Sequence, residues 1–197
     1  MVADVSRIAF TALVAAVGVQ RLWELRRSAH NEAWIRAAGG KEHAAGQMPW
    51  MRALHASWLV GMLVEIWTLR PTASLPVAAI GLVVFVAGQA LRILAISTLG
   101  RRWTVKVMTL PGEPAVSAGV FRWIRHPNYL GVVLEIAALP MIHGAVLTAV
   151  TGTLLNGLLL VARIRAEEAA LRNDSAYDAA FAGKPRFIPR SSGSAHV

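Results

Sequence analysis

The chain contains no cysteine, which excludes disulfide bonds, thiolate metal sites and cysteine nucleophiles together. Charged residues are also scarce, at 16% of the 197 residues, whereas 55% are hydrophobic and the mean hydropathy is +0.49. A soluble domain of this length needs more charge to wet its surface. Because the apolar residues occur in long blocks, the composition indicates an integral membrane protein. No linker or internal repeat divides the sequence, so we expect one domain over residues 1–197.

Further absences narrow the chemistry. No two of the six histidines have the i, i+4 spacing of a helical metal site, so we expect no bound metal. The G-x-G-x-x-G, P-loop and G-x-S-x-G motifs are missing, which excludes classical nucleotide-fold catalysis. The net charge of +9 does not indicate a nucleic acid partner, because the basic residues flank apolar spans and form no continuous patch.

Four hydrophobic runs predict an all-α fold with about five transmembrane helices. The runs are residues 5–22, 53–69, 75–99 and 129–162. The last run exceeds the roughly 20 residues that cross a bilayer. Pro140, His143 and Gly144 lie near its middle and indicate a tight turn. We therefore expect the last two helices to form a hairpin; the alternative is one longer helix kinked at Pro140.

The distribution of Lys and Arg predicts the orientation of these helices. Residues 21–52 carry six, residues 97–128 carry five and residues 163–197 carry six, whereas the other connections carry only Arg70. With five spans, the positive-inside rule puts the N-terminus outside and the C-terminus in the cytoplasm.

Two polar segments lie outside the predicted spans. Residues 24–49 are expected to form a loop, with an amphipathic stretch over residues 24–37 lying at the membrane interface. Residues 191–197 are mostly small and polar, and we expect them to be frayed.

The block Arg-His-Pro-Asn-Tyr at residues 125–129 combines a cation, an imidazole, a rigid turn and an aromatic ring. Pro127 suits the first turn of a helix, where free backbone N–H groups can hold a carboxylate. The neighbouring aromatic ring can face a sulfonium or stack on a base. The alternative is an interfacial belt, in which Trp123, Arg125 and Tyr129 only anchor the helix.

Ionisable residues near or within the spans are further candidates. Arg163 and Glu167 are spaced i, i+4 and can pair on one helix face. A solvated helix end with salt bridges would explain them, but charges at the mouth of an apolar cavity favour a functional role. Glu65 and Arg92 lie toward span ends, and mutual pairing would account for both. Glu135 is expected to support a pocket on the cytoplasmic side.

These motifs resemble the isoprenylcysteine carboxyl methyltransferase family over roughly residues 75–190. The resemblance is carried by residues 119–131 (GVFRWIRHPNYLG), by Arg-x3-Glu-Glu-x2-Leu at residues 163–171, by Tyr177, and by PRFIP at residues 185–189. It implies S-adenosylmethionine-dependent methyl transfer to a lipid at the cytoplasmic face. Residues 75–190 would be the cofactor-binding and catalytic part, after N-terminal spans and an interfacial loop in residues 1–74.

The resemblance also implies roles for individual residues. The motif places cofactor contacts at Lys106, Val116, Phe121, His126, Pro127, Asn128 and Tyr129. Phe121 stands where eukaryotic relatives often have tyrosine, so any hydroxyl contact there would be absent. Arg163 and Glu167 match the pair associated with substrate and catalysis, and Glu135 and Glu168 would support them.

The N-terminal part resembles a bacterial branch of the family. The resemblance is carried by Arg21-Leu-x-Glu-Leu, Arg27-Ser-x-x-Asn31-Glu and Met51-x-x-Leu-His55. Members of this branch accompany type III polyketide synthases and methylate long-chain alkylpyrones or alkylresorcinols. The resemblance therefore implies an O-methyltransferase of the bacterial inner membrane, whose lipophilic acceptor presents a carboxylate or an acidic hydroxyl.

Methyl transfer from a sulfonium needs mainly alignment with an ionised oxygen. Arg163 would hold this oxyanion, and Glu167 would orient Arg163 or take the proton of a phenol. The rival interpretation is a non-enzymatic membrane scaffold or lipid-binding protein. A transporter is disfavoured by the short spans and the few intramembrane charges.

Overall fold

The computed structural model describes residues 2–174 and 176–189, so the segment expected to be frayed, 191–197, lies outside the described residues. The long helices are α1 (Val2–Ala37), α2 (Met48–Thr68), α3 (Leu75–Leu99), α4 (Pro127–Met141) and α5 (Val146–Asp174). A short α6 (Tyr177–Ala180), three 3-10 turns (Ala45–Gln47, Gly100–Arg102 and Gly119–Arg122) and two strands, β1 (Lys41–His43) and β2 (Val107–Thr109), complete the described fold.

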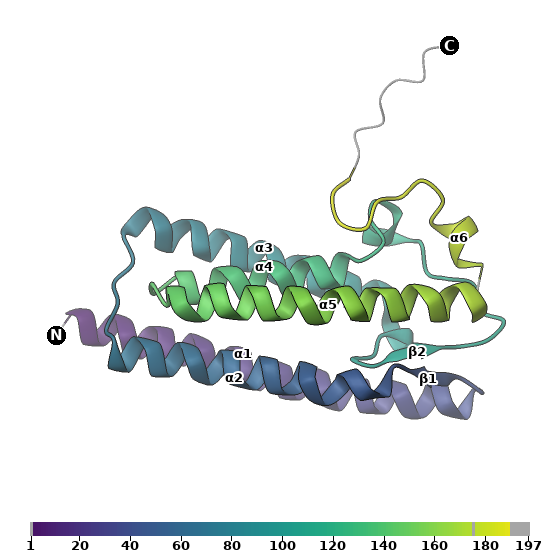
Figure 1. Ribbon diagram of the computed structural model, residues 1–197, viewed down its shortest axis with the longest axis horizontal. Coiled ribbons are helices and arrows are strands. Elements are labelled where there is room, and N and C mark those ends of the chain that lie inside the picture. The colour runs from purple at the N-terminus through teal and green to yellow at the C-terminus, as the bar shows by residue number, and fades with distance from the viewer. Residues whose placement is uncertain (1, 175, 190–197) are drawn as a thin grey trace, which may run out of the picture.

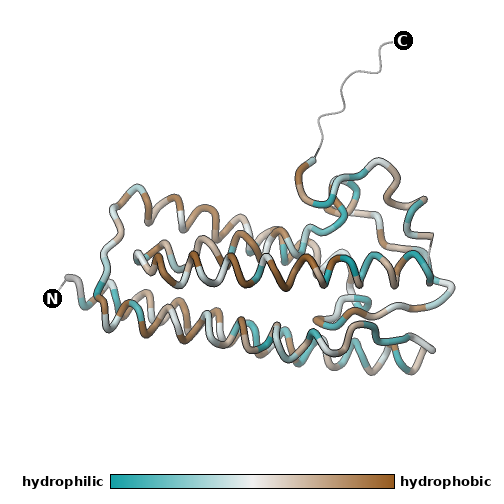
Figure 2. The backbone as a smooth tube through the Cα atoms, in the orientation of Figure 1, coloured by the Kyte–Doolittle hydropathy of each residue, from teal (hydrophilic) through white to brown (hydrophobic). Residues whose placement is uncertain are grey.

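The helices form two layers (Figure 1), with α1 and α2 in one layer and α3, α4 and α5 in the other. The strands, α6 and the C-terminal segment gather at one end of the bundle, which we call the site end. Figure 2 shows hydrophobic residues along the middle of the bundle and hydrophilic residues concentrated toward the site end. The apolar core between the layers includes Met62, Ile66 and Leu139, which are fully buried.

Helix dominates, as the predicted all-α class requires, but β1 and β2 were not predicted. They pair antiparallel, with Glu42 opposite Met108. Among the described residues, three helical segments are long and apolar enough to cross a membrane: Asp4–Ala37, Leu75–Arg102 and Val146–Asn173. The two other predicted spans correspond to α2, with 21 residues, and α4, with 15. Five membrane crossings therefore remain a prediction.

The prediction of a loop over residues 24–49 is wrong for residues 24–37, because α1 continues without a break to Ala37. Ser28 and Asn31, which lie on one face of this helix, are buried because they bind backbone groups of the loop after α3. Ser28 Oγ accepts the Val105 N–H at 2.9 Å, and Asn31 donates to the Trp103 carbonyl at 2.7 Å. At about 1.5 Å per residue the helix is roughly 54 Å long, well beyond a hydrocarbon core of about 30 Å.

Helices α3 and α4 approach closely because both present glycine. A Cβ added at Gly131 would lie 2.8 Å from the Gly88 carbonyl oxygen and 2.4 Å from Arg92 Cγ. After α4 the chain turns at residues 142–145, where Gly144 has a φ of +79°. Any Cβ at this glycine would also approach the backbone of Thr72 to 3.1 Å.

The expected pairing of Glu65 with Arg92 is wrong. Glu65 instead accepts the backbone N–H groups of Leu147 and Thr148 at 3.0 and 2.8 Å. It therefore caps the first turn of α5, where a carboxylate is favourable. Arg92 donates to Glu24 of α1 at 2.6 Å and to Glu135 of α4 at 3.0 Å.

Three buried charges and the partly buried Arg21 form a closed network across three helices, which we call the charged ring: Arg21, Glu24, Arg92 and Glu135. Arg21 completes it by donating to Glu24 at 2.6 Å and to Glu135 at 2.5 Å. Two cations and two carboxylates leave the ring neutral, as burial in an apolar bundle requires. The ring joins α1 to α3 and α4.

Candidate active site

The Arg-His-Pro-Asn-Tyr block forms the turn into α4. Helix α4 begins at Pro127. At the first position of a helix the backbone N–H has no acceptor within the helix, so proline, which lacks this N–H, loses no hydrogen bond there. The turn is held by the C-terminal segment: the Arg125 and His126 N–H groups donate to the carbonyls of Pro185 and Arg186 at 3.0 and 3.1 Å. The PRFIP segment at residues 185–189 therefore packs directly on the Arg-His-Pro-Asn-Tyr block.

Glu168 fixes the orientation of the His126 ring. Its carboxylate is 1% exposed and accepts from His126 Nε2 at 3.0 Å. The Arg186 guanidinium also donates to it, from Nε at 2.9 Å and from Nη2 at 2.7 Å. The other ring nitrogen, Nδ1, lies 3.9 Å from Glu167 Oε1.

The Tyr129 hydroxyl links Arg163 to Glu167, which the sequence predicted to pair directly. Arg163 Nε donates to the Tyr129 oxygen at 2.9 Å, and the Tyr129 hydroxyl donates to Glu167 Oε2. Arg163 Nη2 donates to the Val105 carbonyl at 2.5 Å. Arg163 is only 5% exposed, yet no carboxylate in the described part of the chain is within ion-pair distance of it. Its buried positive charge is therefore not directly compensated.

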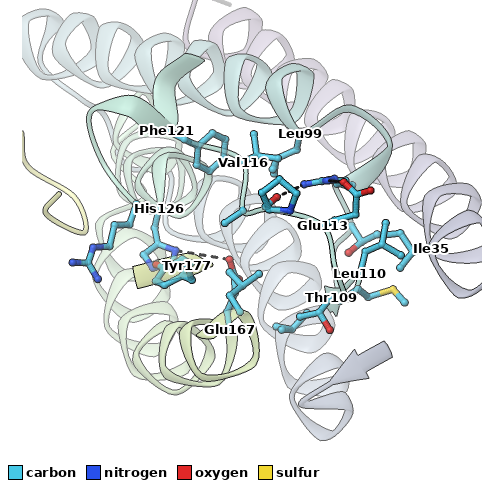
Figure 3. Close-up of a pocket in the computed structure, with 18 of the residues that line it drawn as sticks. Ile35, Leu99, Thr109, Leu110, Glu113, Val116, Phe121, His126, Glu167 and Tyr177 are labelled. Atoms are coloured by element: carbon cyan, nitrogen blue, oxygen red, sulfur yellow. Dashed lines mark hydrogen bonds and ion pairs between the residues drawn. The ribbon is translucent and has the colours of Figure 1, made fainter. Parts of the chain in front are cut away.

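Two cavities meet at this site. The smaller, of about 140 Å³, lies beneath residues 107–116; we call it the polar cavity. Figure 3 shows Phe121, Tyr177, His126 and Glu167 around it, with His126 and Glu167 facing each other. The larger, of about 550 Å³, lies between the two helix layers; we call it the apolar cavity. His126 and Glu167 line both cavities, so the two spaces adjoin at these side chains.

Most of the predicted site residues line one of these cavities. Those at the polar cavity are Lys106, Val116, Phe121, His126 and Glu167. Those at the apolar cavity are Phe121, His126, Asn128, Tyr129, Arg163 and Glu167. Pro127, Glu135 and Glu168 line neither cavity: Pro127 starts α4, Glu135 belongs to the charged ring, and Glu168 holds His126.

Lys106 enters the polar cavity with its charge already engaged. Its ammonium lies 3.1 Å from Glu42 and 3.2 Å from Glu32. The hydrogen bond to Glu42 raises the pKa of Lys106, so the side chain stays protonated at neutral pH. Lys106 therefore also fastens the loop before β2 to α1 and β1.

Sequence reasoning assigned no role to several residues that line the cavities. Tyr177 borders the polar cavity, and burial raises its pKa to about 12. Arg125 borders both cavities and donates to the Lys184 carbonyl at 2.6 Å. Arg52 and His55 of α2 border the apolar cavity. The motif around His55 was noticeable in the sequence, but no local pattern indicates which helix it faces.

Comparison with known proteins identifies the family. The model of the isoprenylcysteine carboxyl methyltransferase (ICMT) family matches residues 79–173. The protein YpbQ of Bacillus subtilis (strain 168), which is described as uncharacterized, is 32% identical over 169 residues, covering 84% of this chain and 98% of YpbQ. An uncharacterized protein of Haemophilus influenzae is 26% identical over 152 residues, covering 77% of this chain and 88% of its own. The chain therefore belongs to the isoprenylcysteine carboxyl methyltransferase family, whose members are membrane methyltransferases.

Proposed function

We propose that this protein methylates an oxygen of an anionic, lipophilic acceptor at the cytoplasmic face of a bacterial inner membrane, with S-adenosylmethionine as the methyl donor. Methyltransferases of this family use S-adenosylmethionine. The oxygen acceptor and the lipid class are inferred from the residues of the site, and the membrane face from the distribution of Lys and Arg along the chain.

The groups around the polar cavity suit this cofactor. Phe121 and Phe181 offer apolar surface for a flat base. Glu113, which is ion-paired with Arg102, offers carboxylate oxygens for hydroxyl groups, and Arg125 provides a cation suited to an α-carboxylate. When bound, the cofactor supplies a methyl group on a positively charged sulfonium, which the face of an aromatic ring favours.

The observation that carries the proposal is the buried Arg163 beside the junction of the two cavities. A desolvated guanidinium without a carboxylate partner is costly, and an acceptor oxyanion would compensate it. A carboxylate or an acidic hydroxyl arrives ionised near neutral pH, so no strong base is needed. Through Tyr129, Glu167 fixes the direction of the Arg163 guanidinium. For a less acidic hydroxyl, Glu167 would accept the proton.

The apolar cavity favours an acceptor with a hydrocarbon chain. Leucine, methionine and valine side chains of α1, α2, α4 and α5 contribute to its walls, together with five arginines. Long-chain alkylpyrones, alkylresorcinols and prenylated thiol-acids all combine such a chain with an acidic oxygen. A non-enzymatic scaffold is the alternative, and it predicts no cofactor binding.

The proposal can be tested by incubating membranes that contain the protein with labelled S-adenosylmethionine and candidate lipids, and then identifying the labelled product. Arg163→Ala should lower turnover by roughly 10²–10³-fold, and Glu167→Gln should also lower it, while calorimetric cofactor binding persists in both. Arg165→Ala is the matched control, because Arg165 is exposed on the same helix. Wild-type turnover in both site variants would refute the assigned roles, and folded protein that binds no cofactor would favour the scaffold.

A further inference from the structure

His55 of α2 adds a polar group to the wall of the apolar cavity. Its Nδ1 lies 2.8 Å from the Met51 carbonyl oxygen, one turn earlier in the same helix. A carbonyl oxygen only accepts hydrogen bonds, so Nδ1 must carry a hydrogen and donate it. This bond within the helix fixes the ring and leaves Nε2 as the nitrogen that can meet a ligand.

The charges that act on the His55 ring are both positive. They are the guanidinium groups of Arg21 on α1 and Arg163 on α5. Within residues 2–174 and 176–189, no carboxylate lies within ion-pair distance of this imidazole. An imidazolium would add a third positive charge without a counter-ion. The ring is therefore neutral, and Nε2 keeps its lone pair.

Trp103, which directly follows the 3-10 turn Gly100–Arg102, adds a complementary group to the same cavity. It is 3% exposed, and its buried Nε1–H has no acceptor among the described residues. The Val105 carbonyl, which accepts from Arg163, lies two residues farther along the chain. A buried N–H without an acceptor is costly, so an oxygen of a ligand would be favourable there. The cavity thus offers an acceptor at His55 and a donor at Trp103.

A hydroxyl group suits both of these side chains, whereas a carboxylate suits only one. A neutral hydroxyl donates one hydrogen bond and accepts others, so it can serve His55 Nε2 and Trp103 Nε1 alike. An ionised carboxylate only accepts, and it would leave the His55 lone pair without a donor. The oxygen that Arg163 holds is ionised in the proposed reaction, so that oxygen cannot be the donor. The head group therefore needs a second oxygen that keeps its proton.

We propose that His55 and Trp103 form a hydroxyl subsite, which binds a second, protonated oxygen of the acceptor head group while Arg163 holds the oxygen to be methylated. This inference rests on the proposed function and narrows its acceptor. A long-chain alkylresorcinol keeps one hydroxyl when its other oxygen ionises. A pyrone with a single hydroxyl and a prenylated thiol-acid keep none. His55 therefore sets the specificity for head groups with two hydroxyls.

Nitrogen NMR of the protein labelled at histidine tests the hydroxyl subsite without any turnover. The His55 Nε2 signal is assigned by its loss in His55→Gln. In detergent at neutral pH we expect the signal of a neutral ring, which moves upfield with pentadecylresorcinol and stays in place with hexadecanoate. Both probes have a long chain, but only the first carries hydroxyl donors. A protonated ring in the free protein, or the same response to both probes, would overturn the proposal.

Methyl transfer gives a second readout. Wild type should prefer pentadecylresorcinol to pentadecylphenol, which lacks the second hydroxyl. His55→Phe should lower this ratio of kcat/KM values by roughly three- to tenfold, with an unchanged cofactor Kd. Trp103→Phe, which removes the N–H, should act in the same direction. His30→Phe is the matched control, because His30 is exposed on α1.

The two readouts separate this inference from the proposed function. No preference in wild type, or an unchanged ratio in both folded variants, would overturn the hydroxyl subsite. A shifted Nε2 signal in a protein that methylates neither lipid would refute the proposed function and uphold the subsite. Transfer to pentadecylresorcinol with an unmoved signal would do the reverse.

Discussion

Removal of one cation from the charged ring should destabilise the protein strongly. Arg92→Met leaves Glu24 and Glu135 sharing Arg21, so one buried carboxylate loses its compensation. Both carboxylates are nearly inaccessible, with side chains 6% and 3% exposed. Breaking a buried ion pair from one side costs about 3–5 kcal/mol. For a chain of this length that loss corresponds to a fall in Tm of roughly 6–20 °C.

The double variant Arg92→Met/Glu135→Gln separates charge from packing. It removes one charge of each sign and leaves Arg21 paired with Glu24, so much of the loss should be recovered. The Tm values of wild type, Arg92→Met and the double variant are measured in detergent by circular dichroism of the helices. Arg165→Met is the control, because Arg165 is exposed and its replacement should change Tm little. The reasoning is refuted if Arg92→Met melts within 2 °C of wild type, or if the double variant is no more stable than Arg92→Met.

Three further outcomes are expected. Tyr129→Phe removes the hydroxyl between Arg163 and Glu167, and should lower kcat by roughly 5- to 150-fold with an unchanged cofactor Kd; an unchanged kcat would show that the link is dispensable. Glu65→Gln weakens the cap of α5 and should cost about 1–3 kcal/mol of unfolding free energy without affecting kcat, and a large loss of kcat would contradict a purely structural role. Burial raises the pKa of Tyr177 to about 12, so wild type should lose unfolding free energy as pH rises from about 10, the usual tyrosine value, toward 12. Below that window this group contributes no pH dependence, and Tyr177→Phe should reduce the alkaline loss measured by chemical unfolding.

The elements that could be located from the sequence are those set by residues close together in the chain. The apolar run at residues 75–99 is α3, with Leu75–Leu99 as its bounds. Pro127 marks the start of α4, and the turn after α4 falls at residues 142–145, where Pro140, His143 and Gly144 indicated it. Apolar length, proline and glycine act within a few residues, so one sequence is enough to recognise them.

Features that depend on contacts between distant elements were not predictable in the same way. The polar face of α1 resembles a surface stretch, because a buried partner made of backbone carbonyls leaves no pattern in the sequence. Arg92 was assigned to Glu65, although its partners lie on α1 and α4. The Tyr129 link between Arg163 and Glu167 was missed for the same reason, since i, i+4 spacing describes only one helix.

The hydrogen bonds between the C-terminal segment and the turn at His126 affect the order in which the site forms during synthesis. The carbonyls of Pro185 and Arg186 hold the Arg125 and His126 N–H groups, and Arg186 neutralises the Glu168 that orients His126. These partners follow α1 to α5 in the chain and are translated after them. A nascent chain in which only α1 to α5 have been made therefore lacks the contacts that hold the turn at the junction of the two cavities. The turn is held only after residues 184–187 have been translated and have docked.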